Sequence, residues 1–144
     1  MPTDTATSTV VVTAPLESVL EHLLAVEDTP HWVPDITEVE VLTRNPDGTP
    51  LTAAIAATTA VGTDRYTVRY EHSPTSLSWH LVEGRMQTGQ DAEYVLRPLE
   101  ASRTEVTFTL AISHHLPLPG FIRSRTIRAL VSNNTGGLVR HFAG

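Results

Sequence analysis

The sequence contains no cysteine, which excludes disulfide bonds, thiolate catalysis and sulfur-ligated zinc sites. Lysine is also absent, so all ten basic residues are arginines. No hydrophobic run approaches the roughly 20 residues that a membrane-spanning helix needs, and residues 1–8 lack the basic and apolar regions of a signal peptide. The sequence therefore predicts a cytoplasmic protein without membrane insertion, stabilised by packing alone.

The charge balance is acidic. Sixteen acidic and ten basic residues give a formal net charge of −6, which would repel a phosphate backbone, so nucleic acid is not an expected partner. The chain has 144 residues, of which 40% are hydrophobic and 18% charged, close to the averages of globular proteins. These values predict one domain spanning residues 1–144, large enough to bury a core and still enclose a ligand-sized hollow.

The first third of the chain shows strand and helix signals in turn. A β-branched run predicts a strand over residues 7–13, and Pro15 then begins a stretch with apolar residues at helical spacing over residues 15–26. Prolines bracket the next segment, where a one-turn helix is expected around residues 31–33. Two short helices are thus expected after the first strand.

From Ile36 the apolar period changes from 3.6 to 2, which is typical of strands. A strand from Ile36 ends in the turn Asn45-Pro46-Asp47-Gly48, and further strands are predicted over residues 51–60, 65–71, 76–83, 87–98 and 104–113. The connections are short, and parallel crossovers need a dozen residues or more, so neighbouring strands must be antiparallel. Alternation places one face of the sheet in the core, with Trp79 on it in phase with Leu77 and Leu81.

Residues 121–142 are predicted to form a long helix that covers this face. Its expected inner stripe consists of Ile122, Ala129, Leu130, Leu138 and Phe142. The fold class is therefore α+β, a curved seven-stranded antiparallel sheet around a long C-terminal helix, with two short helices after strand one.

Several segments carry a resemblance to a known family: Val12-Thr13-Ala14-Pro15, Trp32-Val33-Pro34-Asp35-Ile36, Val39-Glu40-Val41, residues 77–84 (LSWHLVEG) and residues 116–121 (LPLPGF). With this order of elements, the chain resembles the polyketide cyclase/dehydrase branch of the START and Bet v 1-like (SRPBCC) superfamily over roughly residues 8–142. The resemblance implies a helix-grip fold whose cavity holds lipids, sterols, polyketides or other flat apolar molecules. It implies no single reaction.

Aromatic residues are few, yet most fall on the inward face or at the expected cavity mouth. Buried Tyr and Trp carry a polar tip that seeks a partner, which suits a pocket, although plain core packing explains such residues as well. The candidate ligand-binding residues are Trp32, Tyr66, Tyr70, Trp79, Tyr94, Phe108 and Phe121, together with Asn133 as a polar residue on the inner face of the last helix.

Signatures of catalysis and of cofactors are missing from the sequence. There is no HExxH, and neighbours His114 and His115 would point to opposite faces of a strand, so no metal site is expected. Gly136 and Gly137 do not form a glycine-rich nucleotide loop, so no cofactor is expected. No catalytic residue can be assigned.

Three functions remain open on this pattern. The first is binding of a hydrophobic polyketide-like or lipid-like molecule in an internal cavity, as a carrier or sequestering protein in secondary metabolism. The second is a polyketide aromatase/cyclase that folds its substrate in the pocket and moves protons with Tyr or His groups. The third is an interaction module with a filled core and an exposed apolar patch. The oligomeric state is not predicted.

Residues 133–137 (NNTGG) conflict with the helical pattern on either side of them, because two glycines cost roughly 1 kcal/mol each in a helix interior. One hypothesis is a gate, in which the glycines let the last turn lift for a ligand. The alternative is close packing of the helix against the rest of the fold, or simple fraying near its end.

Overall fold

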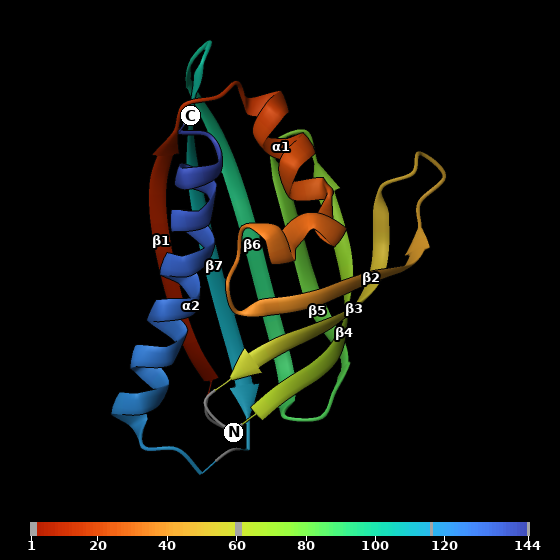
Figure 1. Cartoon of the computed structure of the whole chain (residues 1–144), viewed down its shortest axis with the longest axis vertical. Coiled ribbons are helices and arrows are strands. Elements are labelled where there is room, and N and C mark those ends of the chain that lie inside the picture. Colours follow the sequence, from red (N-terminus) through yellow and green to blue (C-terminus); the bar gives the residue numbers. More distant parts are fainter. Residues whose placement is uncertain (1–2, 60–61, 116, 144) are drawn as a thin grey trace.

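The computed structural model describes residues 3–59, 62–115 and 117–143. Figure 1 shows the arrangement of its elements in space. The elements in chain order are β1 (Thr3–Val12), α1 (Leu16–Leu24), the 3-10 helix η1 (Val26–His31), β2 (Ile36–Arg44), β3 (Pro50–Thr59), β4 (Gly62–Ser73), β5 (Ser76–Gly84), β6 (Gln87–Glu100), β7 (Arg103–His114) and α2 (Gly120–His141). The expected strand over residues 51–60 and the motif at residues 116–121 each include one residue, Ala60 and Leu116, outside the described part.

The strands form one antiparallel sheet of seven strands in the order β1-β7-β6-β5-β4-β3-β2. Only β1 leaves the sequential meander, because it pairs with β7 at one edge, with Val10 opposite Val106. The sheet curves, and α2 lies along β1 and β7 on the same side as α1 (Figure 1). The predicted α+β helix-grip architecture is confirmed. None of the helices in the described part of the chain has the length and apolarity needed to cross a membrane.

Two local predictions were wrong. The second short helix lies upstream of the expected residues 31–33: η1 ends at His31, and Trp32 is its C-cap. Val33 precedes Pro34, and the residue before a proline is disfavoured in the helical region, so the turn cannot extend there. On α2, Ala129 is exposed and does not belong to the inner stripe. The buried residues of this helix are Ile127, Val131, Thr135, Gly137 and Leu138.

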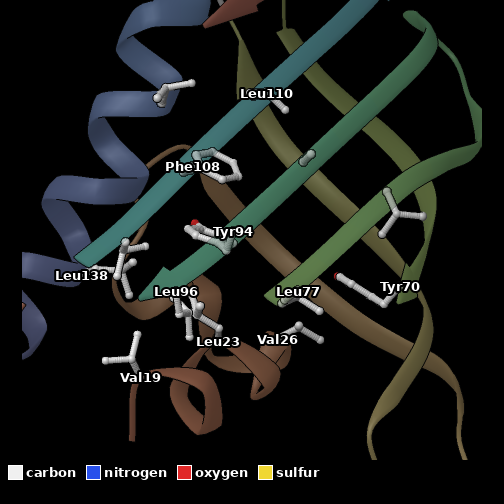
Figure 2. Close-up of a cluster of buried hydrophobic side chains, with 14 of the residues drawn as sticks. Val19, Leu23, Val26, Tyr70, Leu77, Tyr94, Leu96, Phe108, Leu110 and Leu138 are labelled. Atoms are coloured by element: carbon white, nitrogen blue, oxygen red, sulfur yellow. The ribbon is translucent and has the colours of Figure 1, made fainter. Parts of the chain in front are cut away.

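The core fills the space between the concave face of the sheet, α1 and α2. Figure 2 shows side chains such as Leu77, Phe108, Leu23 and Leu138, which come from strands and from both α-helices. The alternation predicted for β4 to β7 is confirmed: Val68, Leu77, Leu96 and Phe108 are buried, and Trp79 packs on the same cluster.

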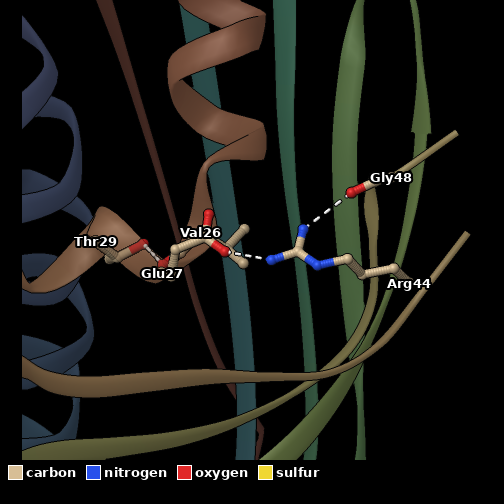
Figure 3. Close-up of polar contacts among 5 residues, drawn as sticks. All are labelled: Val26, Glu27, Thr29, Arg44 and Gly48. Carbon is tan, nitrogen blue, oxygen red and sulfur yellow. Dashed lines mark hydrogen bonds and ion pairs between the residues drawn. The ribbon is translucent and has the colours of Figure 1, made fainter.

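The β2–β3 hairpin contacts η1 from the outside. Figure 3 shows Arg44, which donates from Nη2 to Glu27 at 2.7 Å and from Nη1 to the carbonyl oxygen of Gly48 at 2.9 Å. Within η1, the Thr29 hydroxyl donates to the Val26 carbonyl at 2.7 Å. The ion pair is largely exposed and contributes little free energy, but it joins η1, whose Val26 and Thr29 line an internal cavity, to the far edge of the sheet.

Candidate functional site

An apolar cavity of about 190 Å³ lies between the concave face of the sheet, η1 and α2. Its walls come from every strand and from all three helices, with Leu23 of α1, Val26 of η1, Ile55 of β3, Leu110 of β7 and Ile127 of α2 among the lining residues. An apolar cavity of roughly 150 Å³ is enough to admit benzene. The protein can therefore hold at least one ring in this space without unpacking its core.

Four aromatic rings from four neighbouring strands form one wall of the cavity. Trp79 lies in the middle, with ring centroids 5.9 Å from Tyr70, 5.9 Å from Tyr94 and 5.8 Å from Phe108. Tyr94 and Phe108 stack at 4.2 Å with planes 20° apart. Such a wall offers flat faces and ring edges to a ligand, which favours planar molecules over branched ones.

A row of polar side chains lies on the same sheet face beside these rings. The indole Nε1 of Trp79 donates to Gln90 Oε1, the Gln90 amide donates to Gln87 Oε1, and the Gln87 amide donates to Asp64 Oδ2, each at 2.7 Å. All four residues line the cavity, and only 3% of Asp64 is exposed. The other oxygen of this carboxyl group, Oδ1, is buried and has no hydrogen-bond partner among the described residues.

Three tyrosine hydroxyls face this environment as neutral groups. Burial raises the pKa of Tyr94 well above its usual value, and its hydroxyl donates to Asn134 Oδ1 of α2 at 3.0 Å. Burial also raises the pKa of Tyr66, reinforced by the negative charge of Asp64 and partly offset by a side-chain hydrogen bond with Gln90. For Tyr70, burial again is the main cause of a raised pKa, followed by the nearby Tyr66 and Glu27. All three remain hydrogen-bond donors at neutral pH.

Ionisable side chains gather where β1, the end of β7 and the first turns of α2 meet. His114 Nε2 lies 3.4 Å from Asp4 Oδ2, and Arg123 Nε lies 3.5 Å from the same oxygen. All three residues line the cavity and are mostly buried. This end of the cavity is polar, whereas the aromatic wall is apolar, so the cavity has an amphipathic character.

The structure brings together six of the eight residues predicted for the site. Trp32, Tyr66, Tyr70, Trp79, Tyr94 and Phe108 all line the cavity. Phe121 does not, since 67% of it is exposed on the first turn of α2. Asn133 does not line it either, because its amide turns toward η1 and β2 and donates to Asp35 Oδ2 at 2.8 Å. Its neighbour Asn134 takes the expected inner position.

Sequence reasoning missed the polar row. Asp64 shares the inward phase of Tyr66 and Val68, and Gln90 shares that of Ala92 and Tyr94, so strict alternation could have found both. Gln87 could not be found in this way, because a register shift between Gln87 and Gly89 interrupts the pairing of β6 with β7. No three histidine, aspartate or glutamate side chains in the described ranges are grouped so that they could hold a metal ion.

Comparison with known families agrees with this architecture. The family described as "Polyketide cyclase / dehydrase and lipid transport" matches residues 12–137. The chain belongs to this family, whose description covers both enzymes and lipid carriers.

Solved structures show the same fold at low sequence identity. A START superfamily protein from Mycobacterium smegmatis superposes with a TM-score of 0.88 at 20% identity, covering 96% of this chain and 97% of the other. The Zhui aromatase/cyclase from Streptomyces sp. R1128 has a TM-score of 0.78 at 18% identity, with 96% and 90% covered. A protein from Thermus thermophilus has a TM-score of 0.79 at 19% identity, with 99% and 97% covered. No curated protein sequence gives a significant match.

Proposed function

We propose that the protein binds a hydrophobic, ring-containing small molecule in its internal cavity and acts as a carrier or sequestering protein. The observation that carries this proposal is the unfilled space itself: about 190 Å³ in a chain of only 144 residues, walled by four mutually packed aromatic rings. Protein interiors are normally packed to crystal-like density, and an empty apolar volume costs stability. A ligand that fills it would recover this free energy.

The lining favours a flat polyketide-like molecule, or a lipid-like molecule with a stiff ring system. Trp79, Tyr94 and Phe108 provide ring faces, and Leu77, Leu110 and Ile127 provide aliphatic contacts. Polar side chains in the lining form two hydrogen-bonded or ionic groups, Asp64–Gln87–Gln90 and Asp4–His114–Arg123, beside the Tyr94–Asn134 pair. Sparse polar groups in an apolar pocket orient a ligand more than they attract it.

Native mass spectrometry of the purified protein tests the proposal. We expect a co-purified apolar molecule, or stoichiometric uptake of an added tricyclic aromatic compound such as a hydroxyanthraquinone. Ala57→Phe should abolish uptake, because Ala57 lines the cavity from β3 and a phenyl ring there would occupy it. The matched control is Ala54→Phe on the opposite face of the same strand, which should leave uptake intact. Equal uptake by both variants would place the ligand elsewhere.

A second function, a polyketide aromatase/cyclase, is favoured by one specific feature. Asp64 has a carboxyl oxygen without a hydrogen-bond partner among the described residues, and its charge helps to raise the pKa of Tyr66, so the cavity lining offers a proton acceptor and a neutral hydrogen-bond donor. In an aldol-type ring closure, an acceptor of this kind would take a proton from carbon while the donor stabilises the negative charge that develops on oxygen.

Turnover separates the two functions. For a cyclase, Tyr66→Phe should lower kcat far more than it weakens substrate binding, since the interaction matters most in the transition state. For a carrier, the same change should only weaken binding, and incubation with a poly-β-ketone should give no ring-closed product above the rate without protein.

A further inference from the structure

The hydrogen bonds of the polar row beside the aromatic wall all run from donor to acceptor in the same direction, from Trp79 to Asp64. An indole N–H can only donate, so Gln90 must present its oxygen to Trp79 and its amide nitrogen to the next residue. Gln87 accepts from Gln90 and therefore points its own nitrogen at Asp64. Side-chain amide orientations are usually ambiguous, but here the donor at one end determines both.

The row ends on an acceptor with unused capacity. Asp64 lines the cavity and accepts the Gln87 amide through Oδ2, while its Oδ1 is buried without a hydrogen-bond partner among the described residues. A buried carboxyl oxygen without a hydrogen bond is costly, and such groups are rare in folded proteins. The indole and amide hydrogen bonds of the row run from one residue to the next, and no described residue donates to this oxygen, so a group that enters the cavity beside Asp64 can supply the missing donor.

We infer that the cavity is specific for ligands carrying a hydroxyl group, a phenol or an enol, whose O–H donates to Asp64 Oδ1 while the attached ring packs against Trp79. This inference rests on the proposed function and specifies the ligand class for the same site. A carbonyl, ether or carboxylate at this position would face the acceptor with lone pairs and would be rejected. The row from Trp79 to Asp64 therefore makes the cavity bind hydroxylated rings in preference to their unsubstituted or oxidised counterparts.

Three probes of similar ring size test the inference: 2-naphthol, naphthalene and 2-acetylnaphthalene. Binding is measured by titration of the tryptophan fluorescence of the full chain. The wild-type protein should bind 2-naphthol at least about tenfold more tightly than naphthalene, although naphthalene is the more hydrophobic of the two. This comparison needs no variant, so it stands even if a substitution in the row impairs folding.

Asp64→Asn then exchanges the acceptor for a group that can turn its amide N–H toward the cavity. It should remove the preference for 2-naphthol, leave naphthalene binding within about twofold and improve 2-acetylnaphthalene binding about tenfold. The matched control is Asp91→Asn on the exposed face of β6, which should preserve the wild-type order of affinities.

The possible failures are distinct. A wild-type protein that binds all three probes equally, or a preference for 2-naphthol that survives Asp64→Asn, overturns the role of Asp64 but leaves an apolar binding site in place. A wild-type protein that binds none of the three overturns the proposed function, and the hydroxyl specificity with it.

Discussion

Gly137 of α2 packs directly on the backbone of Trp32. A Cβ atom built on this glycine would overlap the Trp32 carbonyl oxygen and lie 3.0 Å from Cε3 of the indole ring. At Gly136, by contrast, a Cβ would meet only the guanidinium end of Arg140, at 3.3 Å. Close packing therefore accounts for the first glycine, and the gate hypothesis gains no support from it.

The two glycines give a matched pair of substitutions. Gly137→Ala should lower the free energy of unfolding by about 1 to 3 kcal/mol, because the helix must move away from Trp32. Gly136→Ala should raise it by up to about 1 kcal/mol, because alanine favours the helix and the Arg140 side chain can give way. Urea denaturation of both variants measures the difference. Stabilisation by Gly137→Ala together with slower ligand association would revive the gate.

The fold followed from the sequence largely because alternation along a strand is insensitive to where the strand ends. Tyr66, Trp79 and Tyr94 were placed on the inner face correctly although the boundaries of their strands differ from the prediction by up to three residues. The covering helix followed from the apolar spacing over residues 121–142, whereas the helix-grip arrangement around a cavity came from the family resemblance.

Placement on α2 was less successful for a geometrical reason. Successive residues on a helix are turned by about 100°, so one position decides whether Asn133 or Asn134 enters the cavity. The apolar stripe that would fix this rotation is interrupted by Thr135 and the two glycines, and Phe121 lies in the first turn, where no stripe precedes it. The cavity itself was expected only from the resemblance, since its volume depends on how side chains pack.

A hydrogen bond between Tyr94 and Asn134 joins β6 to α2 across the cavity, at 3.0 Å. In a double-mutant cycle with Tyr94→Phe and Asn134→Ala, we expect a coupling free energy of about 0.5 to 1.5 kcal/mol, the range of one neutral hydrogen bond. Tyr70→Phe serves as the control. Asn134 accepts its hydrogen bond from Tyr94, so the coupling free energy between Tyr70 and Asn134 should be close to zero. Chemical denaturation gives all the required values, and equal couplings for the two tyrosines would contradict this interpretation.

Both tryptophans line the cavity, Trp32 beside α2 and Trp79 in the aromatic wall. The single-tryptophan variants Trp32→Phe and Trp79→Phe should therefore both lose fluorescence when a hydroxyanthraquinone is added, each along a single-site binding curve. A charged nucleotide such as ATP should quench neither, because the aromatic wall offers its phosphates no counter-charge. Loss of fluorescence in only one of the two variants would contradict a single cavity that both side chains line.

His22 is half-buried against the end of α2 and stacks on His141 with ring centroids 3.8 Å apart. Burial, and secondarily the charge of His141, lower the pKa of His22 from its ordinary value of 6.5 to about 4, although Asp28 acts in the opposite direction. Between these two pH values the unfolded chain binds a proton that the native ring does not, so stability should fall as the pH drops from 6.5 to 4 and level off below. We expect a loss of about 1 to 2 kcal/mol in the free energy of unfolding, less than the whole shift would give, because the ring is only half buried.

Urea denaturation at about pH 7 and about pH 4.5 measures this loss. His22→Phe should remove most of it, while the exposed control His80→Gln should keep it. An unchanged pH dependence in His22→Phe would assign the acid sensitivity to other groups.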